Sequence, residues 1–390
     1  MNNFYKTLSG KFHIPSAEPN ITEDDAKAAY NAIKEGRLSS GSYVKKFEQE
    51  FANYIGTKFA IAVNSATSGL QLALASLGIY DGEVITTPFT YAATSNVIVH
   101  QNAKPVFVDV DKETYNIDPA DIRRKLTEFT RAIMPVSIFG LPADFDTVGA
   151  IADDHNLVVI EDDAQCFLAY YKERLVGTIG DAASFSLQGS KHITSGGDGG
   201  MVITSNEELA TGIRKAAVQG YSALGPSAGS TTMPRDIRQD WEFERHSHMG
   251  YNFRISAMQS ALGLAQLERM KYLVAARRII AHQYEKVIRS EGCEWLVPPV
   301  VPQGSTHSYW CYTCKLNEEL LGVDWRTFRR TFIEHGGDGL YGLWTPVHLE
   351  PVFRDMSFYG APERAPNYDM RYKGNIKAYR SGDCPTAEAV

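Results

Sequence analysis

A lysine and an aspartate in this sequence each follow a short apolar run, and together they could act on a carbonyl compound. Lys191 lies among small residues, after the run 183–187 and before a glycine cluster at 196–200. A lysine whose pKa is lowered by its surroundings can attack a carbonyl carbon as a free amine. Asp162 follows the run 157–160, where a carboxylate could hold a protonated ring nitrogen. For each residue alone, a solvated side chain is the simpler interpretation.

A third polar group follows the apolar run 59–63. Residues 64–69 are small and hydroxylated, and a helical pattern begins within them. Backbone N–H groups at the start of a helix, with hydroxyls nearby, can bind a phosphate. An ordinary N-cap by Ser65 or Thr67 explains the same residues. Neither a Gly-x-Gly-x-x-Gly motif after the first strand nor a Walker loop is present.

The elements that must position these groups alternate regularly between residues 58 and 204. The apolar runs are rich in Val and Ile and alternate little, as expected for strands covered by helices on both faces. We therefore predict an α/β fold with a mostly parallel, doubly wound sheet, whose ligands bind at the carboxyl ends of the strands. The predicted strands are 59–63, 83–87, 105–109, 132–138, 157–162, 183–187 and 200–204, and the predicted helices are 68–77, 92–100, 119–129 and 146–155.

The rest of the chain has a different organisation. Residues 221–248 are polar and predict a long surface loop, and residues 258–284 predict a long helix. The aromatic-rich segment 309–316 predicts a strand, which with 340–347 indicates a smaller domain. We expect a large domain over residues 1–270, with its N-terminal segment near a smaller C-terminal α+β domain over residues 271–390.

Composition limits the classes of function. The 390 residues carry a formal net charge of -7, which argues against general nucleic-acid binding. The N-terminus has no apolar core of a signal peptide, and no apolar run is long enough to span a bilayer, so we expect a cytoplasmic protein without a membrane partner. Cys311 and Cys314 lack further ligands at zinc spacing and are interpreted as buried strand cysteines on opposite faces, so no metal site is expected.

Six ordered segments make the chain similar, over nearly its whole length, to the DegT/StrS family of sugar aminotransferases. The resemblance implies the fold of fold-type I pyridoxal phosphate enzymes, with pyridoxal phosphate as the cofactor. It also implies that members of the family continue beyond this point through a further strand and helix, so we expect the natural C-terminus of this chain to be missing. The segments are 38–48, 64–70, 88–96, 160–165, 184–200 and 250–256.

The resemblance implies roles for individual residues. Lys191 matches the lysine that forms the Schiff base with the cofactor and later moves a proton between substrate and cofactor. Asp162 matches the partner of the pyridine nitrogen, and Gln165 matches a residue near the ring hydroxyl. Tyr91 matches an aromatic ring that stacks on the cofactor. The residues that match the phosphate cradle are Ala66, Thr67 and Ser186.

Three later residues match positions nearer the substrate or the partner subunit. Asn252 matches an asparagine that reaches the phosphate from the neighbouring subunit, so a homodimer with shared active sites is implied. Arg254 is expected to bind a carboxylate or phosphate of the donor or sugar, with a structural ion pair as the alternative. His348 matches a block at the substrate mouth, and a packing histidine is the alternative.

The resemblance implies transfer of an amino group from glutamate or glutamine to a keto-sugar, which we expect to be nucleotide-linked, in a setting such as lipopolysaccharide biosynthesis. A transaminase acting on a keto-inositol is the first alternative. A sugar dehydratase of the same family carries histidine in place of the lysine, and His192 lies one position from Lys191. A pyridoxal phosphate-binding regulator is the non-enzymatic alternative.

Overall fold

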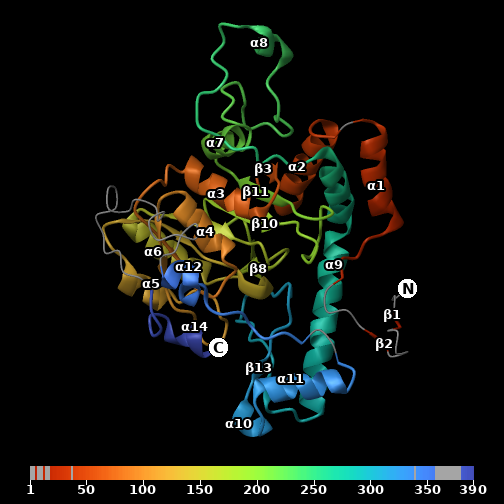
Figure 1. The fold of residues 1–390 in the computed structure, drawn as a ribbon, viewed down its shortest axis with the longest axis vertical. Helices are drawn as coiled ribbons and strands as arrows, with labels where there is room; N and C mark the ends of the chain where they lie inside the picture. The colour runs from red at the N-terminus through yellow and green to blue at the C-terminus, as the bar shows by residue number, and fades with distance from the viewer. Residues whose placement is uncertain (1–4, 7–11, 14–17, 37, 338–339, 356–378) are drawn as a thin grey trace.

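A computed structural model describes residues 5–6, 12–13, 18–36, 38–337, 340–355 and 379–390. Its centre is a seven-stranded sheet (Figure 1). The strands of this sheet are β3 Phe59–Val63, β4 Glu83–Thr86, β5 Lys104–Phe107, β6 Thr130–Met134, β7 Val158–Asp162, β10 Ala182–Ser186 and β11 Gly200–Thr204. The strand order is β3-β11-β10-β7-β6-β4-β5. The strands from β10 to β5 pair in parallel, whereas β11 is antiparallel to both of its neighbours. The mostly parallel sheet predicted from the sequence is confirmed.

Helices cover both faces of this sheet. They begin at residues that cap them well: Ser65, Asp118, Asp144 and Ser256 each accept a backbone N–H of the first turn. The helices are α1 Glu23–Lys34, α2 Ser42–Ile55, α3 Ala66–Ser76, α4 Ala93–His100, α5 Pro119–Lys125, α6 Phe145–His155, α7 Glu207–Ala217, α8 Arg235–Gln239, α9 Ala257–Ser290, α10 Glu318–Leu321, α11 Trp325–Glu334, α12 Pro351–Arg354 and α14 Pro385–Ala389. The helix predicted over 119–129 is shorter, because Leu126 already has an extended backbone.

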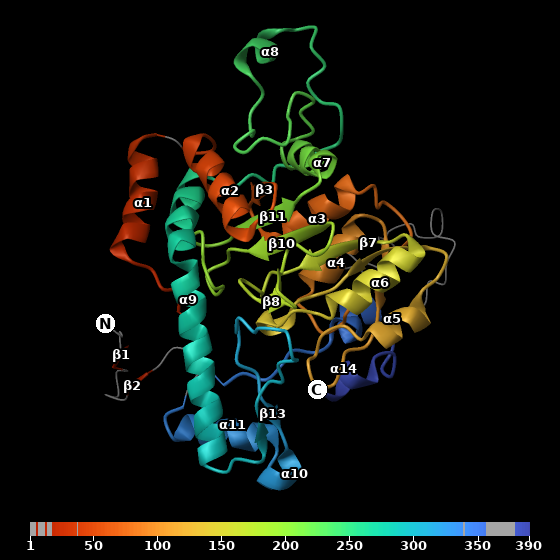
Figure 2. The same cartoon turned by 180° about the vertical axis from the view of Figure 1, so that it is seen from behind.

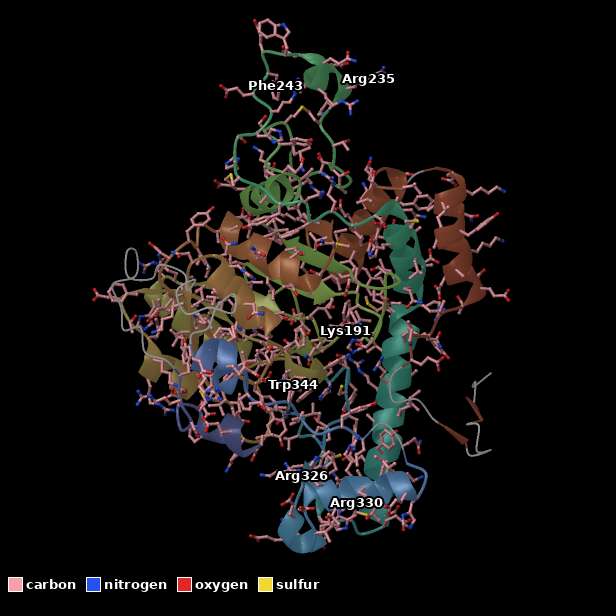
Figure 3. The ribbon with its side chains drawn as sticks, in the orientation of Figure 1. Lys191, Arg235, Phe243, Arg326, Arg330 and Trp344 are labelled. Atoms are coloured by element: carbon pink, nitrogen blue, oxygen red, sulfur yellow. The ribbon has the colours of Figure 1, made fainter. Side chains whose placement is uncertain are left out.

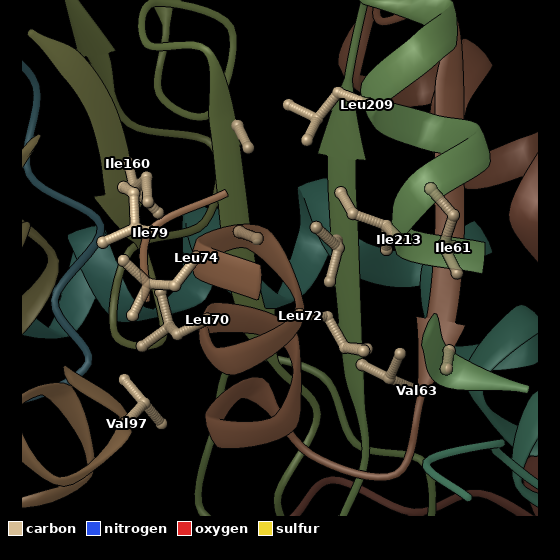
Figure 4. Close-up of a cluster of buried hydrophobic side chains, with 14 of the residues drawn as sticks. Ile61, Val63, Leu70, Leu72, Leu74, Ile79, Val97, Ile160, Leu209 and Ile213 are labelled. Carbon is tan, nitrogen blue, oxygen red and sulfur yellow. The ribbon is translucent and has the colours of Figure 1, made fainter. Parts of the chain in front are cut away.

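The hydrophobic core lies in layers on the two faces of the sheet. On one face, α3 packs on the sheet between the helices α4 and α7, and Leu70, Leu72 and Leu74 are almost completely buried there (Figure 4). On the other face, α2 and α9 cover one half of the sheet and α5 and α6 cover the other (Figure 2). Burial of each such leucine stabilises the fold by about 1.5–3 kcal/mol. This double layer fixes the strand ends to which the polar groups are attached.

The long helix α9 connects this body to the part that carries α10 and α11 (Figure 1). It runs unbroken past residue 270, so the division into residues 1–270 and 271–390 remains a prediction. The short strands β12 Leu296–Val297 and β13 Lys315–Leu316 pair beside these helices. The last helix, α14, returns to the large body, where the N–H groups of Thr386 and Ala387 donate to Asp109. The remaining short strands are β1 Tyr5–Lys6, β2 Phe12–His13, β8 Tyr170–Tyr171 and β9 Arg174–Leu175.

The strand predicted over 309–316 is wrong except for its last two residues, Lys315 and Leu316. Instead of joining a ladder, the N–H of Trp310 donates to Phe139 O, and the carbonyls of Tyr309 and Trp310 accept from Arg277. The aromatic residues of this segment therefore reflect packing against the large body. Cys311 and Cys314 are half-buried and form no disulfide, and they do not lie on a strand.

The predicted loop over 221–248 is confirmed as a mostly irregular segment, interrupted by the short helix α8, and it projects from one end of the molecule (Figure 1). No helix among the described residues is apolar over a length that would cross a membrane.

Candidate active site

The predicted site residues from the large body meet at the carboxyl edge of the sheet. Because β3, β4, β7 and β10 run in the same direction, the segments that follow them emerge at one edge. These segments carry, in turn, the start of α3, Tyr91, Asp162 and Lys191. Lys191 lies in the interior of the molecule, far from the projecting loop that carries Arg235 and Phe243 (Figure 3).

Lys191 is held in a tight loop beyond β10. Its backbone N–H donates to Gln188 O at 2.9 Å, and the loop closes through a bond from Gly189 N to Gly197 O. The Nζ atom lies 3.9 Å from the centre of the Trp310 ring and has no hydrogen-bond partner in the described part of the chain. Burial lowers the pKa of Lys191 to about 8, partly opposed by the negative charge of Asp162. About a tenth of this lysine is therefore a free amine at pH 7, far more than for an ordinary lysine.

Asp162 is a fixed, buried acid at the end of β7, only 4% exposed. One carboxylate oxygen accepts from Thr94 Oγ1 at 2.7 Å, and the other accepts from Ala164 N at 3.2 Å. Burial raises the pKa of this carboxyl, whereas the hydrogen bonds from Thr94 and Ala164 and the charge of Lys191 lower it. A cationic ring nitrogen beside it would favour the ionised form further.

The neighbouring acid, Asp163, is unsuited to the same role. Side chains alternate along a strand, so Asp163 and Glu161 face away from Asp162. Both are fully buried, and Glu161 accepts three backbone N–H groups of residues 177–180. Burial, and next the charge of Glu161, raise the pKa of Asp163 well above its ordinary value. The surroundings of Asp163 therefore favour its protonated form.

Gln165 is oriented by the backbone of Phe139. Its Oε1 accepts from Phe139 N at 2.8 Å, and the side chain is 5% exposed. Because this bond occupies the amide oxygen, the NH₂ group of Gln165 remains available as a donor. Phe139 has a positive φ of 56°, a conformation that non-glycine residues adopt rarely. The arrangement fits a donor directed at a ring hydroxyl.

The start of α3 has the features of an anion site. Ser65 caps the helix by accepting from Ser68 N, and in the described residues the N–H groups of Ala66 and Thr67 have no partner. A Cβ on Gly200 would lie 2.4 Å from the carbonyl carbon of Ser65, so only glycine lets β11 approach this turn. Ser186 pairs with Gly200 in the sheet, which places its backbone beside the turn.

Tyr91 and Trp344 lie at the open side of this edge. Tyr91 is 70% exposed. Trp344 comes from the C-terminal part, and its Nε1–H donates to Thr90 O at 3.0 Å (Figure 3). Sequence analysis missed Trp344 and Trp310 as site residues. The only signal was the aromatic content of their segments.

The structure does not bring Asn252 or Arg254 to Lys191. Their segment runs along the end of β3, where Asn64 N donates to Phe253 O, and the Asn252 side chain is exposed. Arg254 forms no ion pair among the described residues, which disfavours the structural alternative for it. It lines a pocket of about 180 Å³ at the base of the projecting loop. The residues around this arginine pocket are Ser39, Ser40, Tyr221, Thr231, Thr232, Met233, Arg238, Arg245 and Arg254.

Two histidines lie away from the reacting groups. His348 is completely buried, and its Nε2 is 2.9 Å from Glu388 Oε1 in α14. This placement favours packing over the substrate contact predicted for it. His192 is also buried, with Nε2 3.1 Å from Ser308 O. Burial lowers its pKa well below the ordinary value, and its position leaves Lys191, not His192, beside Asp162.

Comparisons with known proteins identify the family and support the fold. Residues 19–376 match the model of the DegT/DnrJ/EryC1/StrS aminotransferase family. The GDP-perosamine synthase of Caulobacter vibrioides is 39% identical over 346 residues, 88% of each chain. The spore coat polysaccharide biosynthesis protein SpsC of Bacillus subtilis is 35% identical over 361 residues, 92% of this chain and 90% of that one. A solved aminotransferase structure from Psychrobacter cryohalolentis is 31% identical with a TM-score of 0.80, covering 95% of this chain and 91% of that one.

Proposed function

Because the chain belongs to the DegT/DnrJ/EryC1/StrS aminotransferase family, whose members use pyridoxal phosphate, we propose that it moves an amino group from glutamate or glutamine to a keto group on a nucleotide-linked sugar. The observation that carries the chemistry is the buried Lys191 amine at the same sheet edge as the fixed Asp162 carboxylate. Bound pyridoxal phosphate supplies an aldehyde that carries amino groups and a ring that accepts electrons.

The residues of this edge fit the cofactor. The Lys191 amine would hold it covalently and would move a proton at Nζ. Asp162 would keep the ring nitrogen protonated, and its bonds to Thr94 and Ala164 hold the carboxylate in place. The N–H groups of Ala66 and Thr67 and the hydroxyl of Ser186 would bind the phosphate. Gln165 would donate to the ring hydroxyl, and Tyr91 would pack on the ring.

The site is completed by a second copy of the chain. Asn252 is exposed on its own chain, and its backbone pairs with Val218 beside the end of β3. The segment 221–249 projects and exposes large apolar side chains, with Trp241 82% exposed and Met249 96% exposed. Exposed apolar groups on a projecting loop are typical of an interface. In a homodimer, this segment and Asn252 would reach the partner's site.

The arginine pocket supports a nucleotide-linked substrate. It presents three guanidinium groups, together with hydroxyls of Ser and Thr, and its lining contains no carboxylate. Guanidinium groups bind phosphate through paired N–H donors. A keto-inositol lacks a diphosphate and would offer Arg254 no anionic group to bind, so this pocket disfavours the cyclitol alternative.

A product assay tests the proposal. Purified protein loaded with pyridoxal phosphate is incubated with glutamate or glutamine and either a nucleotide-linked keto-sugar or a keto-inositol, and the products are identified by mass spectrometry. We expect an amino-sugar that still carries its nucleotide, and no product with Lys191→Ala. Amination of the keto-inositol alone, or loss of water from the sugar without amination, would contradict the proposal.

A further inference from the structure

Three hydrogen bonds hold Trp310 in place in addition to its packing. Its Nε1–H donates to Ser190 O at 3.1 Å, and its backbone N–H donates to Phe139 O at 2.8 Å. Its carbonyl accepts from Arg277 Nη1 at 3.1 Å. Because Ser190 directly precedes Lys191, the first of these bonds ties the indole ring to the backbone of the lysine itself.

The residues that precede Trp310 are also tied to the large body. Ser308 N donates to Gly140 O at 2.8 Å, and Ser308 O lies 3.1 Å from His192 Nε2. One residue earlier, His307 O accepts from Arg278 Nε at 2.9 Å. The segment 307–310 is thus held by the loop of Lys191, by the loop after β6 and by α9. The backbone of this segment cannot move away from Lys191 without breaking several of these bonds, and rotation of the indole ring would break its bond to Ser190.

The contact between Lys191 and Trp310 has the geometry of a cation–π interaction. The 3.9 Å from Nζ to the ring centre is within the range where the negative face of an indole attracts an ammonium. The other ionisable groups that act on Lys191 are Asp162 from β7 and Cys311 from the same segment as Trp310. His192, on the other side of the loop, is kept neutral by burial.

We propose that Trp310 is a positioning residue, whose indole face holds the Lys191 amine whenever that amine is not bonded to the cofactor. The inference rests on the proposed function, because transamination releases the lysine during each half of the reaction. A free, flexible lysine would lose its direction toward the reacting carbon, at an entropic cost. An ammonium resting on the ring stays within the site and is ready for the next proton transfer. The ring also favours the ammonium form, which offsets part of the lowering of the Lys191 pKa by burial.

Nuclear magnetic resonance of the cofactor-free protein tests the contact without reference to activity. The side-chain signals of Lys191 in protein with ¹³C-labelled lysine are assigned from their absence in Lys191→Ala. We expect the Hε protons of Lys191 to be shifted upfield by the indole ring. The shift should remain in Trp310→Phe, which keeps a ring face, and vanish in Trp310→Leu, which keeps only apolar bulk. Trp295→Leu, a change at a tryptophan that packs on Phe328, is the matched control and should leave the signal unchanged.

Titration of the same signals separates positioning from simple exclusion of water. Loss of the ring should lower the pKa of Lys191 by about one unit in Trp310→Leu, because the interaction favours the ammonium. Unshifted Hε protons in the wild-type protein, or a higher pKa in Trp310→Leu, would overturn the inference.

Kinetics provide a second measurement. In Trp310→Leu, we expect kcat to fall about tenfold with KM for the sugar little changed, and Trp310→Phe to recover most of kcat. An unchanged kcat in Trp310→Leu would also overturn the inference. If the wild-type protein performs no amino transfer, the proposed function fails, whereas the resonance experiment still decides whether Trp310 holds the lysine.

Discussion

The carboxyl edge of the sheet and the arginine pocket at the base of the projecting loop hold their polar groups in different ways. At the edge, Asp162 and Gln165 are 4% and 5% exposed, and each has a named hydrogen-bond partner. At the pocket, Arg254 has no ion pair among the described residues, and the loop above it exposes Trp241. The groups proposed to react are thus held in place by bonds within one chain, whereas Arg254, proposed to bind the substrate, has no charged partner in the described part of the chain.

From this difference we predict which kinetic constant each kind of substitution should change. Changes at the edge remove interactions with the reacting atoms and should lower kcat. Changes at the pocket remove interactions made equally in the ground state and the transition state, and should raise KM. Changes at Asn252 should depend on the partner subunit.

The largest effect is expected at the edge, for Asp162→Ala. Without a carboxylate, the ring nitrogen of the cofactor loses its proton more readily, and kcat should fall by at least about a hundredfold. Steady-state kinetics measure this loss, and circular dichroism checks that the fold is retained. Asp163→Asn is the matched control, because that side chain faces away from Asp162 and its surroundings favour the protonated form, and it should stay close to the wild type. A larger loss in Asp163→Asn than in Asp162→Ala would reverse the assignment.

A loss of intermediate size is expected for Asn252→Ala, because removing a hydrogen bond to a charged phosphate costs about 1.5–3 kcal/mol. Mixing this variant with Lys191→Ala should restore activity, because one site of each mixed dimer then has both native residues. Activity is measured after subunit exchange has been verified with tagged chains. If exchanged mixtures remain as inactive as the separate variants, the two residues act within one chain.

A smaller effect, confined to KM, is expected for Arg254→Gln. Loss of one charged donor should raise KM for the nucleotide-linked sugar about tenfold, with little change in kcat. The KM for the amino donor, measured in parallel, serves as the internal control. A rise only in the KM for the donor would place the donor carboxylate at Arg254 and leave the pocket without its proposed diphosphate.

The smallest effect concerns pH. Because the pKa of Lys191 is lowered to about 8, the fraction of free amine rises steeply below that pH and levels off above it. The rate of cofactor capture by the cofactor-free protein should therefore increase less than about twofold between pH 8 and pH 9. Absorption spectroscopy follows this rate. A lysine with an ordinary pKa would instead capture the cofactor about tenfold faster over the same interval.

The sequence predicted the edge better than the pocket for physical reasons. Asp162 and Lys191 follow strands whose apolar pattern is local, so the topology rule for parallel sheets was enough to bring them together. Trp310 could not be found this way, because its position depends on contacts with Phe139, Ser190 and Arg277, which are distant in sequence. From the sequence alone, where these tertiary contacts are not visible, the aromatic-rich run 309–316 could not be told apart from a strand.

Long-range contacts also decided the interpretation of the remaining residues. His348 is buried, and its ring lies within hydrogen-bond distance of Glu388 in the last helix of the chain. The arginine pocket joins Ser39 and Ser40 to lining residues between Tyr221 and Arg254, and no periodicity connects these two parts of the sequence. Asn252 cannot be assigned to a site from one chain at all.

Covalent trapping of the cofactor tests the central claim most directly. The protein loaded with pyridoxal phosphate is reduced with borohydride, which makes the link to the attached amine permanent, and is then digested and examined by mass spectrometry. The account predicts a single modified peptide that carries the reduced cofactor on Lys191. It also predicts no stoichiometric modification in Lys191→Ala. A stoichiometric adduct on another lysine, or an unmodified Lys191 in protein that transfers amino groups, would contradict it.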